Sequence, residues 1–353
     1  MTPLHQFLID SGGVVTFEAF MRWALYDPDH GYYSRGIANV GRTGDFSTSA
    51  TLSPALAQAI AAWALEQRAA VLQPGGRWHI IEVGPGNGQL SAGILRAISK
   101  WTRSKLTYHL IEVSAPLAER QRETLHGLGR GFLSPNLRWH GEITSALEEA
   151  SGQALIFSNE LVDAFPCVVL TRNAAGDDWR EVGLRWDDAR KSVVEVLLDP
   201  CAKRAAEYGA VTAALPDSAR RIEIQFSWRD WLATWRPAWK VGRMLTIDYG
   251  DPSNSVYHRR PNGTLRGYFR QQRIEGAEIY ARAGHQDLTA DVNFSDLIRW
   301  GHASGLNSEP LQTQRGFVLS WNQAAETMDA ATAQILDPLG AGRAFKVLEQ
   351  SAS

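Results

Sequence analysis

Residues 78–88, W-H-I-I-E-V-G-P-G-N-G, decide the fold of this chain. The apolar run at 80–83 predicts a strand, and residues 89–98 predict a helix because their apolar side chains recur at helical spacing. Between them lie three alternating glycines, Gly84, Gly86 and Gly88. Glycine lets a turn adopt positive φ and approach a ligand closely, and the helix N-terminus behind the turn offers N–H groups. The stretch therefore predicts a site for a nucleotide-like ligand.

The spacing of the glycines separates three kinds of nucleotide site. A dinucleotide fingerprint needs glycine where Gln89 stands, and a P-loop needs a Gly-Lys-Ser/Thr ending that the stretch lacks. The remaining pattern, E-x-G-x-G-x-G from Glu82 onward, resembles motif I of the S-adenosylmethionine-dependent methyltransferases, in which the acidic residue helps to place the amino-acid end of the cofactor. The resemblance implies that S-adenosyl-L-methionine is bound by the residues of this motif: Glu82, Gly84, Pro85, Gly86, Asn87 and Gly88.

A second acidic residue follows at the end of the next predicted strand, residues 107–113, T-Y-H-L-I-E-V. A carboxylate at the carboxyl end of the second strand of a doubly wound sheet can accept hydrogen bonds from both ribose hydroxyls of a nucleoside. Glu112 holds this position. We therefore expect Glu112 to bind the cofactor together with the glycine turn.

The composition limits the other possibilities. The chain has 353 residues, 44% of them hydrophobic and 21% charged, with a formal net charge of −2, which is ordinary for a soluble globular protein. This charge argues against nucleic acid as the main partner. Cys167 and Cys201 form no C-x-x-C pair, and nine scattered histidines match no zinc motif, so we expect reduced thiols and no metal. Without a signal peptide or a membrane span, the expected location is the cytoplasm.

Strands and helices alternate along the middle of the chain. After Glu112 the pattern predicts a helix at 115–125, a strand at 136–140, a helix at 144–150 and a strand at 154–158. Such alternation indicates an α/β fold with a parallel sheet covered by helices. From 168 to 198 the period changes to two, which predicts an antiparallel β insertion. Residues 218–239 are expected to be mostly helical, and 243–249 to return to the core sheet.

These patterns give an expected organisation of the chain in four parts. The resemblance to the methyltransferases implies a class I, Rossmann-like doubly wound sheet with an N-terminal helical cap and an antiparallel β insertion. It also implies that residues 1–75 form the helical segment that covers the cofactor cleft, and we expect 76–165 with 240–325 to form the core. Residues 166–239 form the β-rich insertion on the substrate side, and 326–353 form a C-terminal tail.

An ordered set of longer motifs makes the family resemblance sharper. The runs are A-L-Y-D-P-D-H-G-Y-Y near the start, then G-D-F, E-V-G-P-G-N-G, N-E-L-V-D-A-F-P, I-D-Y-G and D-L-T-A-D-V-N-F. Together they resemble the MidA family, the bacterial relatives of the mitochondrial complex I assembly methyltransferase, over residues 20–319. The resemblance implies that Gly44 and Asp45 of the G-D-F loop lie over the cofactor. It also implies a protein substrate, with arginine as the acceptor and a subunit of a respiratory NADH dehydrogenase as a candidate.

The resemblance and the strand ends also select acidic residues for catalysis. In class I folds the end of the third strand, at Glu142, lies beside the adenine, and the end of the fourth strand, at Asn159, lies near the methyl acceptor. A guanidinium stays protonated in water, so nearby carboxylates can hold its charge away from the attacking nitrogen. Glu160, Asp163 and Glu223 are the expected catalytic acids, and Asn159 and Glu142 are expected to bind cofactor.

The chain departs from the family pattern at two motifs. Ala50 and Thr51 replace a Pro-Glu pair, and Asp291 and Asn293 replace a histidine and an aspartate. These changes leave two alternatives open: a chaperone that binds cofactor without catalysis, and a small-molecule methyltransferase. The arginine-rich stretch 258–273 suggests either a surface that binds an acidic protein or nucleic acid, or a solvated loop that closes over the substrate cleft.

Overall fold

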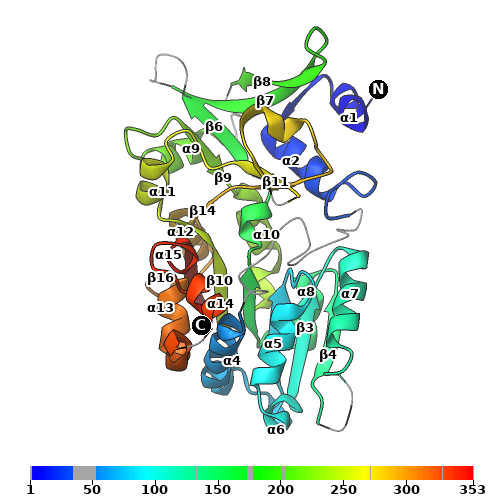
Figure 1. Cartoon of the computed structure of the whole chain (residues 1–353), viewed down its shortest axis with the longest axis vertical. Coiled ribbons are helices and arrows are strands. Elements are labelled where there is room, and N and C mark those ends of the chain that lie inside the picture. Colours follow the sequence, from blue (N-terminus) through cyan, green and yellow to red (C-terminus); the bar gives the residue numbers. More distant parts are fainter. Residues whose placement is uncertain are drawn as a thin grey trace. The chain divides into compact units, whose positions relative to one another are not determined.

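The structure is a computed structural model that describes residues 2–34, 53–129, 131, 133–172, 178–199, 204–270, 272–327 and 329–352. The chain forms two compact units, and Figure 1 labels their elements. The meander unit comprises Met1–Arg35, Val162–Asp230 and Gly250–Leu297. The sheet unit comprises Gly36–Leu161, Trp231–Tyr249 and Ile298–Ser353.

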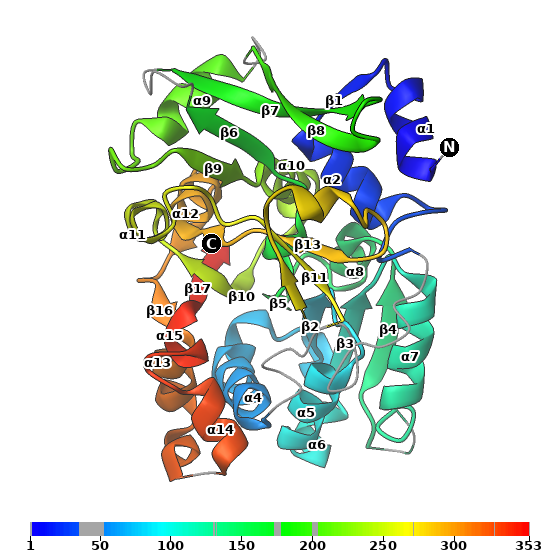
Figure 2. The same ribbon diagram turned by 45° about the horizontal axis from the view of Figure 1, so that its top comes forward.

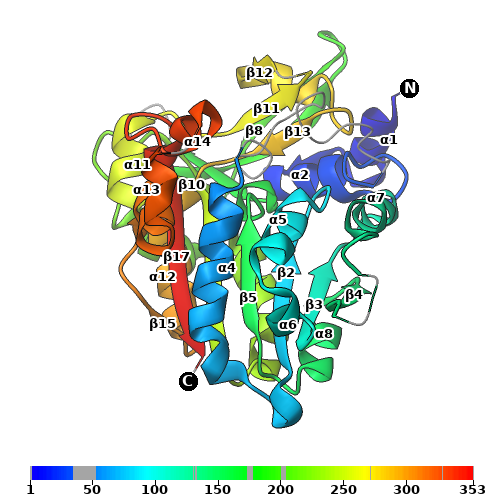
Figure 3. The ribbon, with the colours of Figure 1, turned by 60° about the horizontal axis from the view of Figure 1, so that its bottom comes forward.

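The sheet unit is built on a mostly parallel sheet with the strand order β15-β17-β10-β5-β2-β3-β4, whose strands Figure 3 shows side by side. Strands β10, β5, β2, β3 and β4 pair in parallel, and β17 pairs antiparallel to β10. The mostly parallel α/β sheet confirms the expected fold class. Its strands are β2 (Trp78–Val83), β3 (Leu106–Ile111), β4 (Asn136–His140), β5 (Leu155–Asn159), β10 (Gly242–Asp251), β15 (Asn307–Ser308), β16 (Gln312–Thr313) and β17 (Phe345–Ala352).

Helices accompany the strands of this sheet. Those of the sheet unit are α4 (Ala55–Gln67), α5 (Gln89–Ala97), α6 (Lys100–Arg103), α7 (Ala115–Leu125), α8 (Ile143–Glu149), α13 (Gln314–Trp321), α14 (Ala330–Ile335) and α15 (Ala341–Ala344), with 3-10 turns η1 (Arg68–Val71), η2 (Pro74–Gly76), η4 (Arg236–Ala238) and η6 (Gln323–Thr327). Within the described part of the chain, every helix falls short of the length and apolar character needed to cross a bilayer.

The two faces of β2 and β3 differ in chemistry because side chains alternate along a strand. Trp78, Ile80 and Tyr108 pack into the apolar core with α4 and α5. By this alternation His79 and His109 lie on the other face. Helix α8 packs against β2 and β4. Burial lowers the pKa of His109 to about 3, aided by the neighbouring His79 and His140, so this ring is neutral at pH 7.

The meander unit contains the antiparallel sheet β1-β7-β6-β9, with β8 pairing β7 (Figure 2). This pairing confirms the expected antiparallel insertion. A smaller sheet has the order β12-β11-β13, and β14 pairs with the end of β10 at Gly250 and Asp251. The strands are β1 (Val14–Thr16), β6 (Val168–Arg172), β7 (Trp179–Asp187), β8 (Ser192–Leu198), β9 (Arg221–Ile224), β11 (Arg266–Phe269), β12 (Gln272–Ile274), β13 (Asp287–Thr289) and β14 (Val292–Asn293).

The helices of the meander unit begin with α1 and α2. Thr16 caps α2, as its hydroxyl accepts a hydrogen bond from the N–H of Ala19 at 3.2 Å. Helices α10 and α12 contribute residues to both units. The bounds are α1 (Pro3–Asp10), α2 (Phe17–Tyr26), α9 (Ala205–Thr212), α10 (Phe226–Trp235), α11 (Ser253–Arg259) and α12 (Phe294–Ala303), with 3-10 turns η3 (Val162–Ala164) and η5 (Gly276–Tyr280).

Two expected segments differ in the structure. Residues 221–224 within the expected helical stretch form β9, because Ile222 and Ile224 are buried in an extended segment that pairs with β6. The expected tail 326–353 contains β17, a mostly buried strand that pairs with β10 over eight positions.

The limits of the two units also differ from the four expected parts. Strand β1 pairs with β7, so residues 1–35 belong with the meander, and 250–297 join the same unit. The expected parts 1–75 and 240–325 are therefore each divided between the two units.

Candidate functional site

The glycine turn between β2 and α5 has the geometry that its sequence predicts. Gly84, Gly86 and Gly88 have φ values of 66°, 55° and 79°, a region that favours glycine. A Cβ on Gly84 would lie 2.8 Å from Leu161 Cδ1, whereas a Cβ on Gly86 would meet nothing within 4 Å. The turn therefore leaves open space at Gly86, and Gly88 is the N-cap residue of α5.

Glu82, in β2, stabilises this turn. Its carboxylate is buried and accepts hydrogen bonds from Ser91 Oγ at 2.5 Å and from Tyr108 OH at 2.7 Å. Burial raises the pKa of Glu82 to about 7, although both hydrogen bonds act in the opposite direction. These hydrogen bonds link β2 to α5 and to β3, so Glu82 fixes the position of the turn between β2 and α5.

Glu112 follows β3 and lies beside the turn. Its carboxylate accepts hydrogen bonds from the N–H of Ser114 and from Gln121 Nε2, both at 2.9 Å. Burial raises the pKa of Glu112. The carboxylate is half-buried, and its position after β3 is the one expected for a ribose partner.

Gln121 is a residue that the sequence analysis missed. Its Nε2 donates to Gly86 O at 2.8 Å as well as to Glu112, and its Oε1 accepts from Trp139 Nε1 at 3.1 Å. The side chain thus links the glycine turn, the acid after β3, and β4. A sequence signal was present, since a polar residue stands on the buried face of the helix predicted at 115–125.

The end of β5 presents Asn159 and Glu160. Asn159 Nδ2 donates to Glu160 Oε1 at 3.2 Å, and Asn159 Oδ1 is buried without a hydrogen-bond partner among the described residues. Glu160 has φ 52°, a left-handed conformation that is uncommon for a residue with a side chain. The backbone is fixed there because the N–H of Glu160 donates to Ile247 O at 2.9 Å and that of Leu161 to Asp248 Oδ2 at 3.2 Å.

For the other residues that were expected to bind the cofactor, the structure gives only local contacts. Glu142 is exposed and accepts a long 3.4 Å hydrogen bond from Thr144 Oγ1. Asn87 Oδ1 accepts from the N–H of Gln89, which tightens the turn. Gly44 and Asp45 lie outside the described residues, as do Ala50 and Thr51.

Asp163 belongs to the meander unit, whereas Glu160 belongs to the sheet unit. Asp163 is buried in η3, and its carbonyl accepts from the N–H of Ala290 at 3.0 Å. Asp287 is buried as well and accepts from Tyr33 OH at 2.8 Å. Burial, and then the charge of Asp163, raise the pKa of Asp287 to about 7. The unit therefore holds two buried carboxylates that affect one another.

Glu223 hydrogen-bonds to a different segment of the meander unit, the loop before β11. Its Oε2 accepts from the N–H of Thr264 at 3.0 Å and from Thr264 Oγ1 at 2.9 Å. Its Oε1 lies 2.5 Å from where a Cβ on Gly263 would be. Burial raises the pKa of this fully buried carboxyl. These contacts give Glu223 the task of holding the loop that precedes β11.

The two departures at 291 and 293 also have local partners. Asp291 pairs with Arg266 at 2.6 Å and with Arg260 at 3.4 Å. Asn293 Oδ1 accepts from the N–H of Ser295 at 3.2 Å, as an N-cap residue of α12 does, and its Nδ2 donates to Asp296. Further arginines of the stretch 258–273 pair with acids, Arg259 with Asp251 and Arg273 with Glu275. Much of the charge of this stretch is therefore neutralised within the unit.

A family profile matches residues 59–311, well over half of the chain, and its description is "Putative S-adenosyl-L-methionine-dependent methyltransferase". The chain belongs to this methyltransferase family. The match includes the glycine turn, Glu112, Gln121 and the end of β5. This membership makes S-adenosyl-L-methionine the cofactor and the chain a methyltransferase.

Relatives of this methyltransferase agree with the assignment. The chain is 27% identical to "Protein arginine methyltransferase NDUFAF7, mitochondrial" of Mus musculus, over 90% of this chain and 74% of that protein. It is 25% identical to the Caenorhabditis elegans homologue of that protein, over 83% of this chain and 70% of the relative. A crystal structure from Burkholderia thailandensis, bound to S-adenosyl-homocysteine, superposes with a TM-score of 0.82 and 27% identity over 99% of this chain and 90% of that one.

The sheet unit of the methyltransferase fits such a cofactor by its own chemistry. Open space at Gly86 admits the close approach of a ligand to the backbone. The Glu112 carboxylate offers acceptors for hydroxyl groups, and Asn159 Oδ1 is a buried acceptor without a partner among the described residues. These features lie after β2, β3 and β5, at the carboxyl ends of parallel strands, where open α/β sheets bind ligands.

Proposed function

We propose that this methyltransferase modifies arginine in a protein, and that the protein is a subunit of a respiratory NADH dehydrogenase. The curated relatives carry the name of a protein arginine methyltransferase over most of this chain, which supports the acceptor class. The proposed compartment is the cytoplasm. The observation that carries the proposal is Glu160, an acid in a left-handed conformation directly after β5.

The cofactor residues proposed for this chain follow from the strand ends. Glu112 accepts hydrogen bonds from the ribose, and the backbone of the turn Gly84, Pro85, Gly86, Asn87 and Gly88 lies close to the amino-acid end, with Gly86 leaving the space for this approach. Glu82 positions that turn through Ser91 and Tyr108. Glu142 and Asn159 complete the proposed set, together with Gly44 and Asp45.

The chemistry requires the protein to hold one nitrogen in line with a methyl group. When bound, the cofactor would supply an electrophilic methyl group on a sulfonium, and its sulfur would keep the electron pair of the S–C bond when the methyl group passes to the lone pair of the acceptor nitrogen. Glu160 accepts hydrogen bonds from the guanidinium, so that its charge lies away from the attacking nitrogen. The proton released from that nitrogen passes to a carboxylate or to water.

Backbone strain is a reason to assign this task to Glu160. A side chain in the left-handed region costs about 1–2 kcal/mol relative to the right-handed one. The costly conformation is held by the hydrogen bond to Ile247 and by the neighbouring bond of Leu161 to Asp248. Such strain clusters at functional sites because it fixes the direction of a side chain. Asp163 and Glu223 are kept as proposed acids of the reaction, with Asp163 favoured since its charge influences Asp287.

The test uses the full chain and radiolabelled S-adenosyl-L-methionine with respiratory membranes from a strain that lacks this gene. We expect methyl label in one protein subunit, located on arginine by mass spectrometry, and loss of that label with Glu160→Ala. Cofactor affinity measured by calorimetry serves as the control and should change little. Label in small molecules alone would contradict the protein acceptor.

The alternative of a chaperone without catalysis predicts cofactor binding and no transfer. The exchanges at Ala50, Thr51, Asp291 and Asn293 motivate this alternative, and the first two lie outside the described residues. Asp291 and Asn293 have local structural partners, an arginine pair and a helix cap, and Asn caps a helix as well as Asp does. These two departures therefore give little support to a loss of activity. Label incorporation that depends on Glu160 would exclude this alternative.

A further inference from the structure

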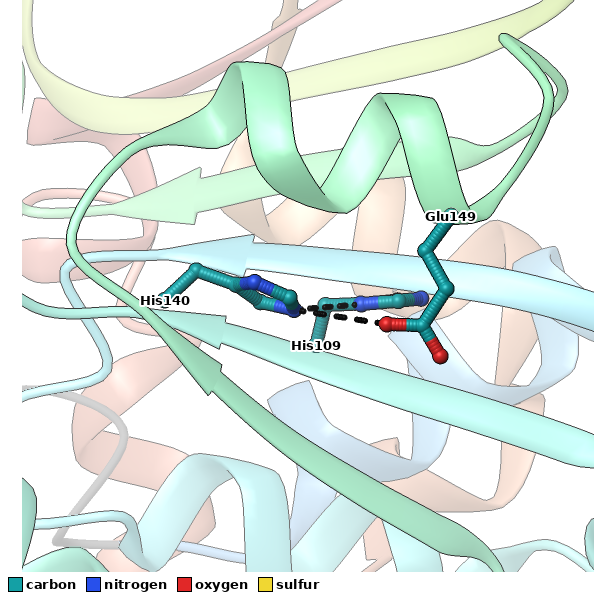
Figure 4. Close-up of side chains that lie close together, drawn as sticks. All are labelled: His109, His140 and Glu149. Carbon is teal, nitrogen blue, oxygen red and sulfur yellow. Dashed lines mark hydrogen bonds and ion pairs between the residues drawn. The ribbon is translucent and has the colours of Figure 1, made fainter.

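Three histidines form a hydrogen-bonded row across β2, β3 and β4, on the face next to α8. His79 Nδ1 lies 2.8 Å from His109 Nε2, and His109 Nδ1 lies 3.0 Å from His140 Nε2. Glu149, at the end of α8, points its carboxylate toward the same row, with Oε2 3.9 Å from His140 Nε2 (Figure 4). Neither the glycine turn nor the acids of the meander unit use this cluster.

Gln73 fixes the direction of every hydrogen bond in the row. Its Nε2 donates to Ala150 O at 2.5 Å, so its Oε1 is the atom that faces His79 Nε2 at 3.2 Å. A carbonyl oxygen can only accept, so His79 carries its proton on Nε2 and has a lone pair on Nδ1. His109 then donates from Nε2 to His79, which leaves a lone pair on His109 Nδ1. That lone pair points toward His140 and Glu149.

These groups have the chemistry and spacing of a transition-metal site. His109, His140 and Glu149 each offer one ligand atom, and these atoms lie within 4.8 Å of one another. Two ligands of a tetrahedral zinc ion with bonds of about 2.0–2.1 Å lie about 3.3 Å apart. The observed 3.0 Å between the two nitrogens and 3.9 Å from nitrogen to oxygen are each within about 0.6 Å of that spacing. Two imidazoles and a carboxylate suit zinc.

The surroundings of the three ligands are built as metal sites require. A ligating histidine almost always donates its other ring N–H to a fixed acceptor, and His109 donates to His79, which in turn donates to Gln73. Arg138 Nε lies 3.3 Å from Oε1 of Glu149, the oxygen that is not the ligand. Glu149 is 37% exposed and His140 14%, so an ion can enter from solvent.

We propose that His109 Nδ1, His140 Nε2 and Glu149 Oε2 bind one Zn²⁺ ion, with a fourth position open to water. Without the ion, His140 donates a hydrogen bond from Nε2 to the lone pair on His109 Nδ1. When the ion binds, the Nε2 proton passes to solvent and Nδ1 takes up another, so the ring stays neutral and the Nε2 lone pair binds the metal. The ion joins β3, β4 and the end of α8. This proposal departs from the expectation, drawn from the sequence, that the chain holds no metal.

The test titrates ZnCl₂ into untagged full-length protein that has been treated with a chelator and dialysed. Calorimetry should give one site per chain, and Co²⁺ alone should give the intense visible absorption of a four-coordinate ion, which Zn²⁺ then abolishes. His140→Gln and Glu149→Gln should each weaken Zn²⁺ binding at least tenfold. The matched control His302→Gln removes an exposed histidine of α12 and should bind as the unmodified protein does.

The Glu149→Gln variant should fold as the unmodified protein does, because this side chain is partly exposed and the change preserves its shape. Its Zn²⁺ affinity therefore reports on the site and not on the fold. Circular dichroism of each variant checks that the fold is retained. A folded protein that binds no Zn²⁺ would overturn the proposal. Binding that both His140→Gln and Glu149→Gln leave unchanged would overturn it as well, since the ion would then lie elsewhere.

Discussion

The glycine turn and the acid pair of the meander unit are polar regions of opposite construction. The turn is made by one consecutive β-α-β segment, and a neutral amide, Gln121, links its parts. The acid pair joins Asp163 and Asp287 from distant segments, with Tyr33 from a third, and brings two like charges into a buried setting. The turn depends on backbone shape, and the acid pair depends on charge. Changes of shape and changes of charge should therefore separate the two regions.

The largest expected effect on cofactor affinity comes from a change of shape at Gly86. Gly86→Val should weaken S-adenosylhomocysteine binding more than about a hundredfold, because the side chain fills the open space where the ligand approaches and disfavours φ 55°. Calorimetry measures the affinity. Gly76→Val is the matched control, since Gly76 also has positive φ and open space but lies before β2. Equal losses in both variants would mean that strain alone is responsible.

A change of charge at Asp163 should affect turnover and leave cofactor binding intact. Asp163→Asn keeps the shape of the side chain and removes the charge that helps to raise the pKa of Asp287. We expect turnover to fall about tenfold to a thousandfold, about 1.4 to 4 kcal/mol, with cofactor affinity changed less than about threefold. Asp188→Asn, an exposed site in the same unit, is the control. Unchanged turnover would remove Asp163 from the reaction.

A change at Gln121 should have a smaller effect on cofactor affinity. Gln121→Met removes the hydrogen bonds to Gly86 O and Glu112 and keeps similar volume, so cofactor affinity should fall about tenfold. Gln314→Met makes the same change at another fully buried glutamine and should leave affinity unchanged. If both variants bind cofactor equally, Gln121 has no part in positioning the turn.

The smallest expected effect concerns the pH dependence of stability at Glu82. Its pKa rises from 4.5 to about 7 on folding, so the folded state binds the proton more tightly than the unfolded state. The stability that this proton contributes is complete below about pH 4.5 and is lost as pH rises through about 7. Glu82→Gln cannot titrate, so its melting temperature should fall less between pH 5 and pH 8. Glu66→Gln, at an exposed site, should fall as much as the unmodified protein.

How well the sequence predicted each part of the structure depends on how far apart in the chain the interacting residues lie. The turn from β2 to α5 was predicted because glycine spacing and helical periodicity are local. Strand β9 was not, because its pairing with β6 joins residues far apart in the chain. Asp163 was predicted as a catalytic acid together with Glu160 and Glu223, and Asp287 was missed since no local pattern links it to Asp163.

The histidine row illustrates the same limit with a signal that was overlooked. His79, His109 and His140 follow one another at intervals of 30 and 31 residues, about the length of a β-α-β repeat. Parallel strands in register bring such residues to one face of the sheet. A search for metal motifs at short spacing does not detect that arrangement, because the partners come from neighbouring strands.

The left-handed backbone at Glu160 has a consequence for any attempt to make this protein sturdier. Glycine adopts φ 52° without the penalty that a side chain brings, so Glu160→Gly removes a local strain. A laboratory selection for heat resistance alone would therefore favour the variant that lacks the carboxylate proposed for catalysis. Screens of this family for robust variants should carry a test of methyl transfer at every round.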